Sequence, residues 1–359
     1  MELVLRIIVT VILGGIGGFI ARKLKMPAGF MIGSLIVVAT INLSTGWLSF
    51  PGSVRKAVQI LAGAMVGSRV SRDDIRGMRQ LVIPSVLYLV YFVLFMILTG
   101  VIMWRSSGVS LVTALFGCAP GGMSDMGIIS GDYGANTALV TVIQLTRLVS
   151  VLLSYPFIFR YLANKNLIHA KPYVNKHERA SGPGGGKKPL INPAVVKESL
   201  ILICAAAIGG LLLNQTGFPS AFIVGGMIGS ATANLAIQDL HLDPRMRFFI
   251  QVCSGAYIGT LVTRADIITL SESYVSVLEI IASVLILPPI FGFLVHKLTK
   301  LDLGTALFGA TPGGLQEMSI LAEDMGLDSP KISIIHTIRI VCALSFFPGI
   351  ISIVLRLLT

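Results

Sequence analysis

The sequence predicts an all-α polytopic membrane protein made of two inverted repeats, each with about five transmembrane helices plus one broken or re-entrant segment. Composition, an internal repeat and the loop charges predict this fold. Of 359 residues, 54% are hydrophobic and 13% are charged, whereas soluble chains carry roughly 25% charged residues. The apolar run at 82–104 matches the roughly 20 residues that cross a bilayer. We therefore exclude a soluble enzyme, a disordered chain and a nucleic-acid-binding domain, and expect the lipid bilayer as the main partner.

The apolar spans of the first half lie near residues 3–21, 28–45, 54–70, 80–104 and 136–160. Between the last two spans, segment 109–132 is interrupted by Pro120-Gly121-Gly122. Proline removes a backbone donor and glycine permits conformations that open a helix, so we expect a hairpin that crosses or re-enters here. The start of the chain has neither a basic region nor a cleavage pattern, which predicts a first span and not a signal peptide.

The second half repeats the first at a constant offset of 192, without gaps. The run ALFGCAPGGMSDM from Ala114 corresponds to ALFGATPGGLQEM from Ala306. The same offset relates Gly17, Gly33, Arg55, Gln59, Gly63, Asp132 and Arg147 to Gly209, Gly225, Arg247, Gln251, Gly255, Asp324 and Arg339. Residues 1–161 and 194–359 are therefore predicted to be two membrane repeats. The basic Gly/Pro-rich stretch 162–193 is predicted to be the linker between them.

Loop charges predict that the repeats are inverted. The basic residues Arg22, Lys23, Lys25, Arg69, Arg76 and Arg79 have as counterparts Asn214, Gln215, Gly217, Leu261, Ile268 and Ser271. After the fourth span the trend reverses, because Lys297 and Lys300 outnumber Arg105. The positive-inside rule then places equivalent loops on opposite faces. We expect ten crossings, a cytoplasmic linker and location in a bacterial inner membrane. Arg55 and Lys56 fall on the outer side and count against this topology.

Interrupted helices at matching places in inverted repeats indicate the substrate site of a secondary transporter. Free N–H groups at a helix start attract anions, and arginine presents a fork suited to carboxylate or phosphate. The candidate binding residues are Pro120, Gly121, Gly122, Ser124, Gln144 and Arg147, with Pro312, Gly313, Gly314, Gln316, His336 and Arg339. The alternative for each break is a structural turn between two helices.

An acidic residue follows each break, Asp125 in the first half and Glu317 in the second. Carboxylates at membrane depth are costly and usually functional, so we expect them to carry a coupling proton. The alternatives are a charge at a helix start, or an ion pair with Arg147 or Arg339. For Asp132 and Asp324 we expect helix capping. The repeated glycines predict close helix packing and permit a homodimer.

Motifs of common enzymes are missing from the sequence, including HExxH, GxSxG, the P-loop and the dinucleotide fingerprint. The five histidines are scattered and the four cysteines are widely spaced. We therefore expect no enzymatic activity, no metal site and no cofactor.

The segments PGGMSDM (Pro120–Met126), PGGLQEM (Pro312–Met318) and ARKLKMPAGFMIGSL (Ala21–Leu35) resemble the duplicated membrane AbrB-type family. Its members are labelled transcriptional regulators or ammonia monooxygenases. The resemblance spans both halves outside the linker. It implies kinship with the cation:proton antiporter and anion transporter superfamily, and therefore a panel domain and a core domain with crossing broken helices. It supplies no substrate and no site residues.

Two functional hypotheses follow. The first is a proton-coupled secondary transporter of a small anionic organic solute, working by alternating access around the paired breaks. The second is a membrane regulator or sensor that influences gene expression without transport.

Overall fold

The computed structural model describes residues 2–70, 78–165, 167–168, 193–218, 220–237, 240 and 242–358. It omits the side chains of Met78, Arg79, Met123, Ser124, Asp125, Ile128, Pro193, Ala194 and Pro244. Most of the expected linker at 162–193 lies outside the described residues, as do the side chains of two candidate site residues, Ser124 and Asp125.

Within the described residues the protein is all-helical, and six helices are long and apolar enough to cross a membrane. They are α1 (Glu2–Lys23), α5 (Val82–Ser107), α8 (Thr137–Asn164), α10 (Pro193–Asn214), α14 (Tyr274–Leu298) and α17 (Ser329–Leu358). The prediction of a multi-pass helical membrane protein is confirmed.

Four shorter helices complete the set of expected spans. They are α2 (Gly29–Thr45), α3 (Gly52–Gly67), α11 (Ala221–Ile237) and α12 (Pro244–Leu261). At 1.5 Å per residue, a 17-residue helix is about 26 Å long, which is just short of the hydrocarbon thickness of roughly 30 Å. The short helices η1 (Met78–Leu81) and α13 (Arg264–Glu272) precede α5 and α14.

Each interrupted segment forms two half-helices. In the first half of the chain these are α6 (Leu111–Cys118) and α7 (Met123–Asp132), and in the second α15 (Leu303–Ala310) and α16 (Leu315–Asp324). Equivalent residues cap the starts of α6 and α15. The Ser110 hydroxyl accepts a hydrogen bond from the backbone N–H of Thr113, and the Asp302 carboxylate accepts one from the backbone N–H of Thr305. The expected breaks at both Pro-Gly-Gly sequences are confirmed.

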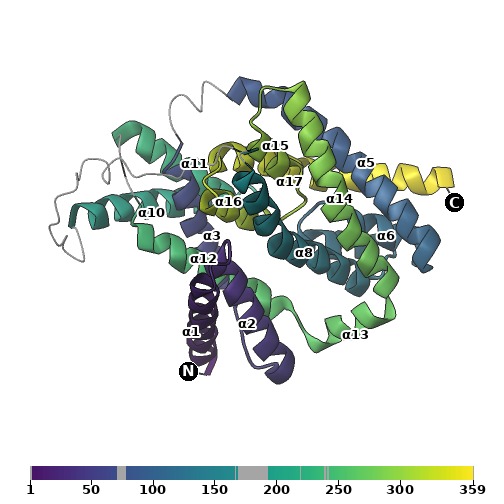
Figure 1. Cartoon of the computed structure of the whole chain (residues 1–359), viewed down its shortest axis with the longest axis horizontal. Coiled ribbons are helices and arrows are strands. Elements are labelled where there is room, and N and C mark those ends of the chain that lie inside the picture. The colour runs from purple at the N-terminus through teal and green to yellow at the C-terminus, as the bar shows by residue number, and fades with distance from the viewer. Residues whose placement is uncertain are drawn as a thin grey trace.

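The helices pack into two groups, each of which draws on both halves of the chain (Figure 1). The six-helix group consists of α1, α2, α3, α10, α11 and α12. The broken-helix group consists of α5, α6, α7, α8, α14, α15, α16 and α17. Helices α16 and α17 touch α3 and so connect the groups. That these two groups are the panel and core implied by the family resemblance stays a prediction.

Glycines and asparagines at the crossings between helices allow the six-helix group to pack closely. A Cβ on Gly17 or Gly209 would collide with the carbonyl oxygen of Gly33 or Gly225, so only glycine fits there. Where α2 passes α12, the Asn42 amide donates to the carbonyls of Thr260 and Val262 at 3.1 Å each. Where α11 passes α3, Asn234 donates to the equivalent carbonyls of Ser68 and Val70 at 2.9 and 3.5 Å.

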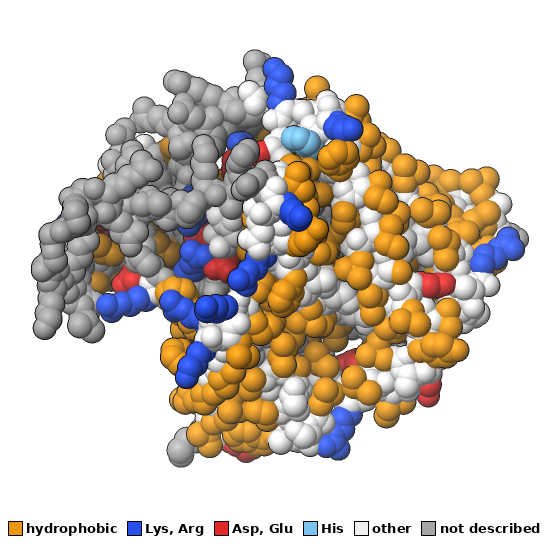
Figure 2. Space-filling model, viewed as in Figure 1, with side chains coloured by type: hydrophobic (Ala, Val, Ile, Leu, Met, Phe, Trp, Pro, Cys, Tyr) orange, Lys and Arg blue, Asp and Glu red, His pale blue; other side chains and the backbone are white. Residues whose placement is uncertain are grey.

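The outer faces of the long helices are apolar. Exposed large side chains recur along them, including Ile8, Ile12 and Ile16 on α1, Val86, Val90 and Leu94 on α5, and Leu278, Ile286 and Ile290 on α14. Figure 2 shows hydrophobic side chains covering the face over α5 and α14, with Lys and Arg gathered elsewhere. A large exposed apolar surface indicates a membrane or protein contact, and its continuity along spanning helices fits contact with lipid.

Candidate functional site

Both breaks have the same backbone geometry. Ala119 and Thr311 leave the helix in extended conformation, and Gly122 and Gly314 are extended again before α7 and α16 begin. Each proline lies at the centre of a three-residue turn, closed by a bond from Gly121 N–H to the Ala119 carbonyl at 2.8 Å and from Gly313 N–H to the Thr311 carbonyl at 2.9 Å. Such turns leave several backbone groups without helical partners.

Two buried arginines supply donors for these backbone groups. The guanidinium of Arg147 donates to the carbonyls of Ala119 (2.7 Å) and Gly121 (3.3 Å). Arg339 donates in the same way to the carbonyls of Thr311 (3.2 Å) and Gly313. Because the carbonyl end of a helix carries partial negative charge, each arginine neutralises the end of its half-helix, α6 or α15.

The arginines therefore have a structural role that the sequence did not predict. Neither of them forms an ion pair with Glu317, whose side chain is among those described. The Nε atoms of both are buried without a hydrogen-bond partner, and both residues line the same cavity. Within the described residues, the Nε–H of each guanidinium is thus free of hydrogen bonds, while its two terminal nitrogens hold the break.

The expected neighbours of the arginines are also present. Gln144 lies one turn before Arg147 and donates to the carbonyls of Phe116 (2.9 Å) and Ala119 (2.8 Å), while its Oε1 accepts from Arg147 at 2.7 Å. His336 occupies the equivalent place beside Arg339 and is fully buried. Gln144 lines the cavity, but His336 does not.

Glu317 lies in the first turn of α16, which begins at the break. Its carboxylate folds back beside Gly314, where a Cβ would collide with Oε2. This position fits the alternative of a charge at a helix start, and the proton-coupling role stays a prediction. The neighbouring Gln316 donates to the Ser254 hydroxyl at 2.6 Å, which ties α16 to α12. The matching prediction concerns Asp125, whose side chain is outside those that the structure describes.

A cavity of about 310 Å³ brings the two breaks together. From the first half of the chain it is lined by Gly121, Gly122, Gln144 and Arg147, and from the second by Gly314, Gln316, Glu317 and Arg339. Pro120, Pro312 and Gly313, which were also expected at the site, are not among the residues that line the cavity. Since the starts of α7 and α16 face the cavity while their carbonyl-ended partners are covered by arginine, the cavity is electropositive apart from Glu317.

At one end the cavity reaches the surface beside the start of α3. Gly52, Lys56 and Asn214 line it there and are exposed. Next to them the guanidinium of Arg55 lies 4.8 Å from the ring centroid of Tyr257, near the end of α12. This mouth carries two positive charges, Arg55 and Lys56, within reach of an entering anion.

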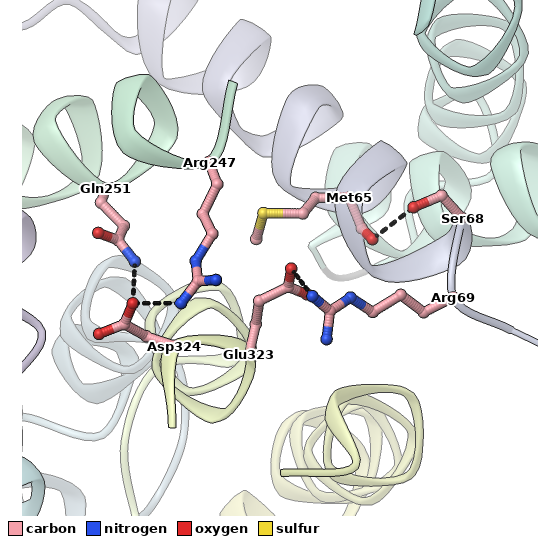
Figure 3. A network of polar contacts seen from close by, with 7 residues as sticks. All are labelled: Met65, Ser68, Arg69, Arg247, Gln251, Glu323 and Asp324. Carbon is pink, nitrogen blue, oxygen red and sulfur yellow. Dashed lines mark hydrogen bonds and ion pairs between the residues drawn. The ribbon is translucent and has the colours of Figure 1, made fainter. Parts of the chain in front are cut away.

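The opposite end of the six-helix group is tied to α16 by two ion pairs (Figure 3). Arg69, just beyond α3, pairs with Glu323, and Arg247, at the start of α12, pairs with Asp324. Gln251 also donates to Asp324 at 3.0 Å. The side chain of Met65 points into the space between the two pairs. Asp324 therefore holds two groups together, which corrects the expectation that it caps a helix.

Sequence reasoning did not assign Arg55, Gln59, Arg69, Tyr257 or Glu323 to the site. The offset of 192 had already marked Arg55 and Gln59 as equivalents of Arg247 and Gln251, and this was the one available signal. Arg69 and Glu323 have no like counterparts, since Leu261 and Gly131 occupy those places. Their pairing depends on how α3 meets α16, which a linear pattern does not encode.

Comparison with known proteins finds a family model and relatives that match this chain over most of its length. The family model described as transition state regulatory protein AbrB matches residues 1–83 and 30–355. The YhjN protein of Bacillus subtilis (strain 168) is 25% identical over 349 residues, covering 92% of this chain and 88% of its own length. A protein of Escherichia coli (strain K12), named as a regulator AbrB, is 20% identical over 336 residues, covering 93% and 91%.

Proposed function

The chain belongs to the AbrB family, and we propose that it is a secondary transporter of a small anionic organic solute. The observation that carries this proposal is the cavity between the two breaks. Its lining combines two helix starts with Arg147 and Arg339, whose guanidinium groups are of the kind that a carboxylate or phosphate accepts hydrogen bonds from. The Nε–H of each arginine is buried and has no hydrogen-bond partner among the described residues. A volume of about 310 Å³ is at the lower end for small-molecule sites and fits a solute of a few carbon atoms.

The two halves act as inverted repeats in this proposal. Paired contacts support that arrangement, because the asparagine bonds of Asn42 and Asn234 and the arginine bonds of Arg147 and Arg339 recur at the offset of 192. Helices α3 and α12 then run in opposite directions, and the cavity opens at one membrane face only. By the positive-inside rule that face is the outer one and the linker is cytoplasmic.

A coupling proton is carried by Glu317, and in the first half by Asp125. Glu317 faces the cavity from a helix start, so an arriving anion and the ionised carboxylate repel each other. Protonation removes that repulsion, which makes anion and proton enter together. The expected result of Glu317→Gln is anion exchange that no longer responds to a pH gradient.

The first test is ligand binding by purified protein. Thermal unfolding in detergent at pH 5.5 and 7.5 is followed with acetate, succinate, inorganic phosphate and a neutral amide present. A ligand that binds the native state raises the unfolding temperature. We expect a carboxylate or phosphate to do so in the wild type, and to do so less in Arg55→Ala/Lys56→Ala, which leaves the buried arginines intact but removes the charges at the mouth. Stabilisation by alkali cations alone would contradict the proposal.

A second candidate function is supported by names alone. The family description and the name of the Escherichia coli relative both designate regulators. A regulator of this kind senses a solute or binds a partner through the basic stretch 162–193. Replacement of the lysines and arginine in 165–190 by glutamine distinguishes the two functions. It abolishes a response that depends on the linker, but leaves solute uptake into proteoliposomes unchanged.

A further inference from the structure

A second cavity, of about 340 Å³, lies at the opposite end of the six-helix group from the first. Three cationic residues, Arg22, Lys25 and Arg160, line it together with the aromatic rings of Phe30 and Phe248. The guanidinium of Arg22 lies 5.3 and 5.1 Å from these two ring centroids. Its charges make it a second place where an anion would gather.

The second cavity is the repeat counterpart of the mouth of the first. Adding or subtracting 192 converts Phe30 into Phe222, Phe248 into Lys56 and Gln251 into Gln59, and each of these lines the first cavity. The two cavities differ at the end of the broken helix. Asp324 and Met325 of α16 line the second cavity, whereas their counterparts Asp132 and Tyr133 of α7 do not line the first.

The same difference appears in the ion pairs. Asp324 is bound by Arg247 and Gln251. Among the described side chains no ion pair joins the counterparts, Arg55 and Asp132: Asp132 is exposed, and Arg55 stacks on Tyr257. Helix α16 also packs against α3, and no comparable packing of α7 on α12 is found among the main helix contacts of the described residues.

We propose that Arg247, Gln251 and Asp324 form a gate that closes the second cavity, and that Arg55, Gln59 and Asp132 form the equivalent gate of a second state. In that state α7 moves against the end of α12, Asp132 binds Arg55 and Gln59, and the first cavity closes while the second opens. The inference rests on the proposed transport function. It assigns to Asp132 and Arg55 a contact that the present state lacks.

Thiol crosslinking in the full-length protein tests this contact. In a background with all four cysteines changed to alanine, the pair Arg55→Cys/Asp132→Cys is reconstituted in lipid vesicles and treated with a short bis-thiol reagent. Crosslinked peptides are measured by mass spectrometry. Addition of Asp324→Asn weakens the closed gate and should raise the 55–132 crosslink roughly tenfold. The matched control Glu2→Gln, which removes the exposed ion pair of Arg6, should leave the yield unchanged.

Two further cysteine pairs calibrate the result. Arg247→Cys/Asp324→Cys should crosslink without any added change, because these residues already touch. Arg55→Cys/Asp324→Cys joins opposite ends and should not crosslink in either state. If the 247–324 pair crosslinks but the 55–132 pair does not, even with Asp324→Asn present, the second gate is wrong. The transporter proposal is then still tested separately, by measuring solute uptake. If 55–132 crosslinks but neither succinate nor phosphate binds or is taken up, the gate holds and the anion transporter is wrong.

A second measurement needs no cysteine changes. Hydrogen–deuterium exchange compares the wild type with Asp324→Asn. The inference expects faster exchange at residues 322–327, which lose their contact, and slower exchange at residues 130–135, which gain one. Unchanged exchange at 130–135 together with faster exchange at 322–327 would overturn it.

Discussion

The two broken segments differ little in how they are built and much in what they touch. In each segment, an arginine of the long helix that follows donates hydrogen bonds to the two carbonyls at equivalent positions of the break. The two segments differ at the far ends of α7 and α16. The far end of α16 is joined by ion pairs to α3 and α12, whereas Asp132 at the end of α7 is exposed.

This difference shows which contacts belong to the fold and which belong to a state. The contacts that hold each break belong to the fold, because the arginine donor on the following long helix and its carbonyl acceptors are buried together. Contacts between the two helix groups use charged side chains. The pair of Arg247 and Asp324 is partly exposed, and such bonds exchange with water at small cost, whereas Glu323 in its pair with Arg69 is buried. A bistable element is expected among the second kind, where a few kcal/mol separate two arrangements.

The largest effect is expected from removing the arginine of a break. Arg339→Ala leaves the carbonyls of Thr311 and Gly313 without their donor, and each unsatisfied buried acceptor costs about 1–3 kcal/mol. Unfolding in detergent should therefore lose about 3–5 kcal/mol, and Arg147→Ala should lose as much. Lysine at either position should recover part of the loss. A large loss at one arginine and none at the other would break the likeness of the two segments.

A smaller effect is expected at the ends of the half-helices, where the two segments differ. Asp324→Asn weakens a partly exposed ion pair and should cost about 1–2 kcal/mol. Its matched control Asp132→Asn removes no side-chain bond found among the described residues, so its unfolding temperature should equal that of the wild type. Equal losses in the two variants would show that Asp132 is already paired and that the ends are alike.

The fold was largely predictable from sequence because a bilayer requires each span to be an apolar helix of roughly fixed length. Each expected apolar stretch became a helix, and Pro120 and Pro312 marked the breaks. The partners of Arg147 and Arg339 were not predictable, because a pattern of residue types shows where charge is placed but not that backbone carbonyls accept it. The ion pairs of Arg69 and Arg247 join helices more than 70 residues apart in the sequence, and only the packed fold brings them together.

The asparagines of the six-helix group should show similar effects at both ends. Asn42→Ala and Asn234→Ala each remove two bonds to carbonyls at the end of a neighbouring helix. Asn234→Ala also removes a bond that Asn234 accepts from the backbone N–H of Leu240 at 3.1 Å. Asn42→Ala should cost about 1 kcal/mol in thermal or denaturant unfolding, and Asn234→Ala about 1 kcal/mol more for the extra bond. The pair is a control for the gate, because it compares the same two ends of α3 and α12 at contacts that both halves make. A larger loss for Asn42→Ala than for Asn234→Ala would mean that the whole six-helix group is asymmetric, and not only its contact with α16.

The smallest effect concerns the charges at the mouths of the two cavities. Lys56 is exposed at the mouth of the first, and Lys25 at the second, which Asp324 closes. An exposed charge acts on an anion through solvent, so its loss should weaken binding by only about threefold at low salt. Titration of succinate, followed by thermal unfolding, should show this loss for Lys56→Gln and none for Lys25→Gln. At 0.5 M salt the loss should vanish, since the screening length then falls well below about 8 Å. If Lys25→Gln weakens binding as much as Lys56→Gln, the bound anion reaches both cavities at once. The ion pair of Arg247 with Asp324 would then not be a closed gate.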